Sequence, residues 1–231
     1  MVTFSNVEFS YSNQPVFSNL NLHVDEGEFV YLIGKSGIGK STLLQMVYMN
    51  ILPQSGYVQV GGFSSDTIKP HQLPFLRRQV GVVFQDFKLL EDRNVFNNLA
   101  FVLHLLGIPR KELKKRVIDA LTEVGLIHKQ NNMPNQLSGG EKQRVAIARA
   151  IVKNPKVILA DEPTGNLDPE TSMDIMYILQ KISERGTAVI FATHNYELVK
   201  KVRAKIFKLE DGKAVKVVLK PKKETEDQPA D

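Results

Sequence analysis

Gly34-Lys35-Ser36-Gly37-Ile38-Gly39-Lys40-Ser41 is the stretch that decides the fold, and it fits the pattern G-x-x-x-x-G-K-[ST]. It follows the apolar run Phe29-Val30-Tyr31-Leu32-Ile33, which is typical of a strand buried on both faces of a parallel sheet. A helix is expected directly after the loop, to about Tyr48. In this order of elements, backbone N–H groups and a helix N-terminus surround phosphate oxygens. We expect Lys40 to contact the β- and γ-phosphates, the Ser41 hydroxyl to bind Mg²⁺, and the rest of the loop with Thr42 to bind the nucleotide.

The residues on either side of this loop indicate a mixed α/β protein. Apolar and polar residues alternate between Val2 and Val24, as in half-buried strands joined by turns. Apolar residues recur at helical spacing between Arg93 and Ile151. Buried strands are predicted by the continuous apolar runs at 80–84, 157–160, 188–192 and 206–209. The chain is thus expected to have a strand-rich start, an α/β core, a mostly helical insert and a resumed core.

The composition is that of a globular protein without thiol chemistry. The 231 residues are 42% hydrophobic and 24% charged, which is ordinary for a globular domain. The absence of cysteine excludes disulfides, cysteine zinc sites, iron–sulfur clusters and thiol nucleophiles. The first residues show no signal-peptide pattern, and no run reaches the roughly 18 apolar residues of a membrane span. We therefore expect a cytoplasmic protein.

The basic excess of the chain is concentrated at its C-terminal end. There are 30 Lys and Arg against 25 Asp and Glu, a net charge of +5, but residues 1–199 are nearly balanced. A nearly neutral body excludes a globally basic duplex-binding protein, so no nucleic-acid partner is expected. The basic end has two open explanations, weak attraction to anionic lipid headgroups or solubilisation. Residues 220–231 lack apolar side chains able to pack and are expected to form a disordered tail.

Two consecutive carboxylates follow the predicted strand at 157–160, in the sequence Val157-Ile-Leu-Ala-Asp161-Glu162. Ligands bind at the carboxyl ends of strands in open α/β sheets, so this position suits catalytic groups. Successive strand residues point to opposite faces, which predicts different roles for the two acids. Asp161 is the expected Mg²⁺ partner and Glu162 the expected general base. A strand that ends in Asp-Glu also occurs at simple turns, and the phosphate loop is what favours the catalytic interpretation.

A second anion site is predicted at Leu137-Ser138-Gly139-Gly140-Glu141-Lys142-Gln143, which leads into a helix. Backbone amides, the Ser138 hydroxyl and a helix N-terminus converge there. The alternative is a plain helix cap, with Ser138 and Glu141 forming a capping box. A cap explains the serine and the glutamate but leaves the paired glycines unexplained.

These three motifs, in this order and spacing, resemble those of ABC-type ATPases, over about residues 2–217. The resemblance implies the P-loop NTPase fold of this family: a RecA-like core, an N-terminal antiparallel β subdomain and an inserted α-helical subdomain. It implies one ATPase domain at residues 1–219, with the helical subdomain at 86–153. It further implies Mg²⁺-dependent hydrolysis of ATP by a dimer, in which each ATP lies between the phosphate loop of one chain and Ser138, Gly139 and Gly140 of the other.

The resemblance also implies roles for four further residues. Tyr11 stands where an aromatic ring stacks on adenine, and Gln85 where a glutamine reaches Mg²⁺ and water. Asp168 matches an aspartate that crosses the dimer interface at the nucleotide, and His194 a histidine that contacts the γ-phosphate. Each has a plainer alternative: a strand residue, a surface polar group, a helix N-cap and a loop histidine, respectively. Glu162, His194, Gln85 and Lys40 are thus the expected catalytic residues, and Ser41, Gln85 and Asp161 the expected metal ligands.

Residues 84–99 are closely similar to the corresponding segment of the ABC ATPases of bacterial cell division, in Phe84-Gln-Asp-Phe-Lys-Leu-Leu90 and in Asp92-Arg-Asn-Val-Phe-Asn-Asn-Leu99. That resemblance implies an integral membrane partner, a location on the cytoplasmic face of the cell membrane, and control of septal peptidoglycan hydrolysis. Phe87, Leu89 and Leu90 form an apolar cluster with a polar rim, which suits docking of a short partner helix. Alternatively, these three side chains pack beneath the helical subdomain.

Two other functions remain open at this stage. Ala160-Asp-Glu-Pro-Thr-Gly-Asn-Leu-Asp168 is shared with the ATPases of lipoprotein-release and small-molecule export transporters, which would change the partner. Nucleic-acid-associated ABC ATPases share the fold, but they carry a long insert between the phosphate loop and the second motif, and none is present here. One departure from the family pattern is Asn195, where many relatives carry aspartate.

Overall fold

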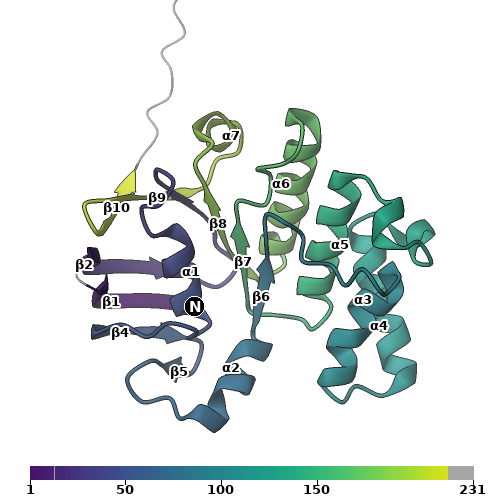
Figure 1. The fold of residues 1–231 in the computed structure, drawn as a ribbon, viewed down its shortest axis with the longest axis horizontal. Coiled ribbons are helices and arrows are strands. Elements are labelled where there is room, and N and C mark those ends of the chain that lie inside the picture. Colours follow the sequence, from purple (N-terminus) through teal and green to yellow (C-terminus); the bar gives the residue numbers. More distant parts are fainter. Residues whose placement is uncertain (13, 218–231) are drawn as a thin grey trace, which may run out of the picture.

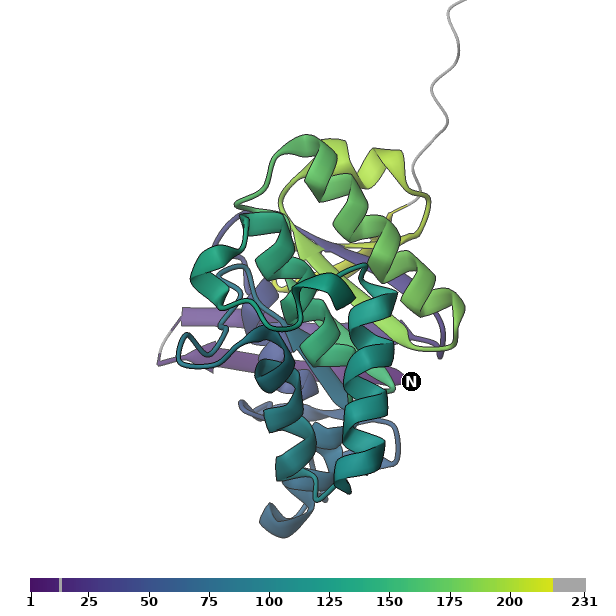
Figure 2. The same cartoon turned by 90° about the vertical axis from the view of Figure 1, so that its right-hand side faces the viewer.

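A computed structural model of the chain describes residues 1–12 and 14–217. Two β-sheets and a layer of helices are stacked side by side, as Figure 1 shows, and Figure 2 views the stack from the helical side. The predicted tail at 220–231 lies outside the described residues.

A six-stranded sheet forms the centre of the molecule, with the strand order β10-β9-β3-β8-β7-β6. Its strands are β3 (Phe29–Ile33), β6 (Val80–Val83), β7 (Val157–Asp161), β8 (Ala188–Thr193), β9 (Lys205–Glu210) and β10 (Lys213–Val217). All neighbours pair in parallel except β9 and β10, which form an antiparallel hairpin. Every residue of β3 and β8 is buried, as the continuous apolar runs predict.

A second sheet is antiparallel and has the order β2-β1-β4-β5. Its strands are β1 (Val2–Tyr11), β2 (Gln14–Val24), β4 (Ser55–Val60) and β5 (Phe63–Ser64). One face is buried and the other is exposed, which explains the alternation of the N-terminal sequence. This sheet contacts the central one through the turn between β9 and β10, where Ser18 N donates to Gly212 O at 3.0 Å.

Seven α-helices lie in the described part of the chain. They are α1 (Lys40–Val47), α2 (Leu73–Arg78), α3 (Val95–Leu105), α4 (Arg110–Glu123), α5 (Gly139–Ile151), α6 (Pro169–Glu184) and α7 (Tyr196–Lys201). Single 3₁₀ turns occur at Pro70–Gln72, Ile127–Lys129 and Pro134–Gln136. Helices α3, α4 and α5 are inserted between β6 and β7 and lie at one side of the central sheet (Figure 1).

The hydrophobic core has two parts, one on each face of the central sheet. Tyr31 and Phe191 point toward the helices of the insert and α6, whereas Leu32 and Ile190 point toward α1 and the antiparallel sheet. This division follows from the period of two along a strand. The fold is therefore the one expected from the sequence: a mixed α/β cassette with a parallel core sheet, an antiparallel sheet and inserted helices. No helix among residues 1–12 and 14–217 is long and apolar enough to cross a membrane.

Candidate active site

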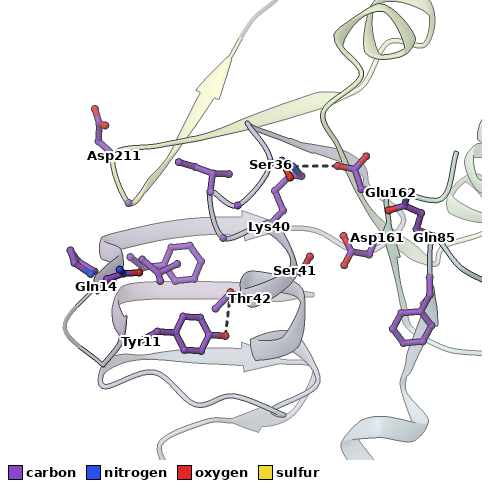
Figure 3. Close-up of a pocket in the computed structure, with 18 of the residues that line it drawn as sticks. Tyr11, Gln14, Ser36, Lys40, Ser41, Thr42, Gln85, Asp161, Glu162 and Asp211 are labelled. Carbon is purple, nitrogen blue, oxygen red and sulfur yellow. Dashed lines mark hydrogen bonds and ion pairs between the residues drawn. The ribbon is translucent and has the colours of Figure 1, made fainter. Parts of the chain in front are cut away.

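A cavity of about 1070 Å³ opens where the two sheets meet, at the carboxyl ends of β3 and β7 (Figure 3). The phosphate loop forms its floor, Tyr11 lies at one end, and the residues that follow β6 and β7 lie at the other. Its walls are Tyr11, Gln14–Ser18, Ser36–Thr42, Phe84–Asp86, Asp161, Glu162, Asn166, Asp211 and Gly212. The structure thus brings together most of the residues predicted from the sequence. The space suits a nucleotide, because pockets for ligands of that size hold about 300–1,000 Å³.

The phosphate loop has the backbone that its glycines predict. Gly37 and Gly39 have φ of 78° and 110°, values that side-chain-bearing residues rarely adopt. A Cβ at Gly39 would also lie 2.8 Å from Val16 Cγ1 of the antiparallel sheet. Lys40 starts α1 with only 6% of its side chain exposed, and its Nζ donates to Gly34 O at 2.8 Å and Lys35 O at 3.2 Å. The loop is therefore wrapped around the Lys40 ammonium group, which we expect to bind phosphate.

Glu162 lies at the centre of a charged cluster. Its Oε1 is 3.3 Å from Lys40 Nζ and 2.9 Å from His194 Nδ1, and His194 N donates to Oε2 at 3.3 Å. Glu162 has left the strand geometry of β7, with φ of 48°, and its N–H donates to Ala192 O at 3.0 Å. A non-glycine residue held in this region is strained, and such strain is concentrated at functional sites. The turn aims the carboxylate at the cavity, beside the lysine and the histidine.

Asp161 and Ser41 offer hard oxygen ligands side by side. Burial raises the pKa of Asp161 above its ordinary value, the nearby Glu162 carboxylate adds to this, and a hydrogen bond with Ser41 opposes it. In nucleotide sites, Mg²⁺ typically binds one or two oxygen ligands from the protein, and phosphate and water oxygens complete its coordination. The donor set therefore fits Mg²⁺, which would stabilise the ionised Asp161 against the cost of burial.

Tyr11 closes the far end of the cavity. Its hydroxyl is 3.4 Å from Thr42 Oγ1, and its ring packs edge-on against Phe9 with centroids 4.8 Å apart. The side chain nevertheless remains 47% exposed, so part of the ring is accessible to a planar ligand. This is the position in which a ring could stack on a base.

Gln85 lines the cavity at the end of β6 and contacts a residue that the sequence interpretation left without a role. Its Nε2 donates to Asn166 Oδ1 at 3.4 Å, and a Cβ at Gly165 would lie 2.9 Å from that nitrogen. The glutamine thus depends on the Gly165-Asn166 turn that follows β7. The signal in the sequence is that Asn166 lies within the shared motif at residues 160–168.

Gln14–Ser18, Asp211 and Gly212 also line the cavity without having been predicted. They come from β2 and from the turn between β9 and β10, which lie far apart in the chain. Nothing in the local sequence marks them as ligand-binding residues. Only the contact between the two sheets brings them to the phosphate loop.

The residues of the second predicted anion site do not line this cavity in the described part of the chain. Ser138 Oγ accepts from Glu141 N at 3.2 Å, and Glu141 Oε2 accepts from Ser138 N at 2.9 Å, which is the capping box considered as the alternative. A side chain at Gly140 would collide with Thr171 Cγ2 of α6. Asp168 likewise caps α6, accepting from Thr171 N at 2.9 Å. These residues have structural roles here, at the N-termini of α5 and α6.

The segment that follows Gln85 is held by polar side chains of the inserted helices. Arg149 of α5 donates to the carbonyls of Phe87 and Lys88, both of which have positive φ. Burial lowers the pKa of Arg149. Asn98 of α3 is fully buried and accepts from Leu90 N at 2.8 Å. The conformation of this segment is therefore fixed from the interior of the helical layer.

The predicted apolar docking cluster is only partly available at the surface. Leu89 packs against the helical core, so the alternative interpretation is correct for this residue. Phe87 and Leu90 are partly buried. A separate cavity of about 530 Å³ lies along α3, where the Arg93 guanidinium stacks over the Phe101 ring at 4.2 Å. That cavity is lined by Asp92–Asn94, Asn97, Ala100, Phe101, His104, Asn131 and Met133.

Asn98→Leu should lower the free energy of unfolding by about 2–4 kcal/mol, since it leaves the Leu90 N–H and the carbonyls of Leu90 and Arg93 without their partner. Urea denaturation measures the change. Asn97→Leu is the matched control, because Asn97 is exposed and should cost less than about 0.5 kcal/mol. Equal effects of the two substitutions would show that the buried amide does not fix the segment.

Comparison with known proteins assigns the chain to a family. A family model described as ABC transporter matches residues 17–165, and the chain belongs to that family. It is 46% identical over 213 residues to the cell division ATP-binding protein FtsE of Bacillus subtilis strain 168, covering 92% of this chain and 93% of the relative. It is 47% identical over 197 residues to FtsE of Streptococcus pneumoniae strain D39, covering 85% and 86%. The similarity to cell-division ATPases expected from residues 84–99 is thereby confirmed.

Solved structures agree with the fold. The ATP-binding cassette MJ0796, in a dimeric post-hydrolysis state bound to ADP and Pi, superimposes with a TM-score of 0.82. Its sequence is 34% identical, and the match covers 96% of this chain and all of that one. The prediction of an ABC ATPase fold is confirmed.

Proposed function

We propose that this protein is a Mg²⁺-dependent ATP hydrolase that works as a dimer and drives a membrane partner in bacterial cell division. The observation that carries the enzymatic part is the cluster of Lys40, Glu162 and His194 at the cavity. A buried ammonium, a carboxylate and an imidazole within hydrogen-bonding distance supply phosphate binding, a proton acceptor and a group to orient both. The cleavage of MJ0796's nucleotide to ADP and Pi supports the same reaction here.

Each residue of the cluster has a defined task in this proposal. When ATP binds, its phosphates replace Glu162 Oε1 as the ion-pair partner of Lys40 Nζ, because a phosphate chain carries more negative charge than one carboxylate. The freed Glu162 carboxylate then accepts a proton from the attacking water. His194, whose Nδ1 is 2.9 Å from Glu162 Oε1, holds the carboxylate in place and would contact the terminal phosphate. Mg²⁺ held by Ser41, Asp161 and Gln85 would neutralise charge on the phosphates.

The dimer follows from the division of the binding residues. The phosphate loop and Glu162 line the cavity, whereas Ser138, Gly139, Gly140 and Asp168 lie outside it. A second copy that presents its α5 N-terminus to the cavity would complete the nucleotide site with backbone N–H groups. The dimeric structures of MJ0796 support the formation of a dimer.

The cell-division role rests on the relatives. Proteins above 40% identity over more than nine tenths of this chain, from Bacillus subtilis to Escherichia coli, are named FtsE. An FtsX-like integral membrane protein is therefore the proposed partner, and the cytoplasmic face of the cell membrane the proposed location. A cytoplasmic segment of this FtsX-like partner would dock in the cavity along α3. There Phe101 and Met133 offer an apolar surface with a charged rim. We expect no nucleic-acid partner.

Co-purification tests the partner. The tagged full chain, extracted from its own membranes with detergent and ATP, should recover an FtsX-like protein. Phe101→Asp should reduce that recovery at least tenfold, because it places a charge in the docking cavity, while ATP hydrolysis by the isolated chain stays within about twofold. Tyr177→Asp, which introduces the same charge at an exposed aromatic residue on α6, is the control. Recovery of a lipoprotein-release or small-molecule export permease alone would assign the ATPase to that other system.

A further inference from the structure

The turn between α3 and α4 combines an exposed apolar side chain with unpaired basic groups. Leu105, the last residue of α3, is 69% exposed, the largest exposed fraction among the large apolar residues that the structure describes. After residues 106–109, the first two turns of α4 present exposed basic side chains: Arg110, Lys111, Lys114 and Lys115. A solvated helix face would explain the charges, but it gives no reason for an exposed leucine at their edge.

These four basic groups are not neutralised by neighbours. The acidic residue of the same turns, Glu112, is paired with Arg116. Within residues 1–12 and 14–217, no ion pair is found for Arg110, Lys111, Lys114 or Lys115. The turn therefore carries a local positive charge on a molecule whose body is nearly neutral.

A second exposed apolar group lies at the same end of the molecule. Phe75 of α2 is 53% exposed, and the Arg78 guanidinium stacks over its ring at 5.0 Å. Figures 1 and 2 both place α2 and the turn between α3 and α4 at the lower end. Helix α2 directly precedes β6, so this is the end where the parallel strands begin. Asp161 and Glu162 lie at the opposite end of the strands. A dimer formed over the nucleotide would therefore leave the lower end exposed.

We propose that this end of the molecule, comprising residues 104–115 and Phe75 with Arg78, binds the surface of a membrane rich in anionic lipid. The basic groups would contact headgroup phosphates, each contributing to attraction at the surface. Leu105 and Phe75 would enter the interfacial layer, as apolar side chains of peripheral proteins do. A nucleic acid would use the same charges but has no need of exposed Leu105. The surface adjoins the docking cavity at His104, so lipid contact and partner binding can occur together.

Vesicle flotation of the full chain tests the proposal without any membrane protein. Vesicles of phosphatidylcholine alone are compared with vesicles containing about equal parts of phosphatidylcholine and phosphatidylglycerol. We expect roughly tenfold or stronger partitioning to the anionic vesicles, and a loss of about tenfold for Lys114→Gln/Lys115→Gln. Leu105→Ser, which leaves the charge unchanged, should also weaken partitioning severalfold.

The matched control is Lys88→Gln/Lys181→Gln, which removes the same charge from exposed positions outside this surface. It should bind anionic vesicles like the wild type, and every variant retains the basic C-terminal end. ATP hydrolysis and the melting temperature should be unchanged in all of them. Equal losses for the two double variants, an unchanged Leu105→Ser, or no preference of the wild type for anionic vesicles would overturn the proposal. Binding of duplex DNA that depends on Lys114 and Lys115, without vesicle binding, would assign the surface to nucleic acid.

Discussion

Glu162→Gln should retain ATP and accumulate as a stable dimer, with turnover reduced at least about a hundredfold. The amide occupies the same space between Lys40 and His194, so the cavity keeps its shape. It cannot accept a proton from water, and general base catalysis contributes roughly 10²–10⁴-fold to a rate. It also removes the negative charge that competes with phosphate for Lys40, so nucleotide affinity should be kept or raised.

Single-turnover hydrolysis and light scattering with ATP and Mg²⁺ measure the two effects separately. Glu184→Gln is the control, because Glu184 is exposed on α6 and lies outside the nucleotide cavity. It should hydrolyse ATP at the wild-type rate and dimerise only transiently. Hydrolysis by Glu162→Gln at a rate close to that of the wild type would place the base elsewhere.

The elements that carry the chemistry could be predicted from the sequence because each rests on a local rule. The strand at Phe29–Ile33 needs only apolar residues, and the phosphate loop needs only glycines where φ is positive. Asp161 and Glu162 were placed at a strand end by the same reasoning. The strained backbone of Glu162 was not foreseen, since successive strand residues were expected simply to face opposite ways.

What escaped prediction depends on contacts between distant segments. Asp211 and Gly212 line the cavity only because the hairpin of β9 and β10 packs against β2. Leu89 could have faced a partner or the core, and its local sequence is the same in both cases. The short helices α2 and α7 have six residues each, too few for a periodic signal. These contacts, the burial of Leu89 and the short helices are all determined by the packing of whole elements, which a local sequence pattern does not reveal.

The Ser138-Gly139-Gly140 motif shows how one local structure can serve two purposes. The capping box and the close approach of Gly140 to Thr171 explain all but one of its residues without any ligand. Gly139 has ordinary clearance, with a Cβ position 3.4 Å from Leu167. A helix N-terminus with little side-chain bulk is nevertheless what a nucleotide on a second chain would need. A capped helix and a phosphate contact across a dimer are compatible, so the cap does not weaken the proposal.

Lys40→Ala should lower ATP affinity roughly a hundredfold or more. The ammonium is the cationic side chain that lies within the loop, with 6% exposure, and it is held between two loop carbonyls and Glu162. ATP would replace the Glu162 contact with stronger ones to phosphate, and truncating one partner of such a buried charge pair costs several kcal/mol. Alanine also leaves Glu162 with only His194 as a partner, so the carboxylate would repel the incoming phosphates.

Titration with a fluorescent ATP analogue measures this affinity, and Lys35→Ala provides a control of equal charge. Lys35 is exposed, and its contacts within the loop come from its backbone carbonyl, which accepts from Lys40 Nζ and Ile38 N and which alanine retains. The ATP affinity of Lys35→Ala should therefore change less than about threefold. A melting temperature for Lys40→Ala close to that of the wild type would show that the cavity survives the change. If both variants bound ATP equally well, Lys40 would not be part of the phosphate site. Its ion pair with Glu162 would then have a purely structural role.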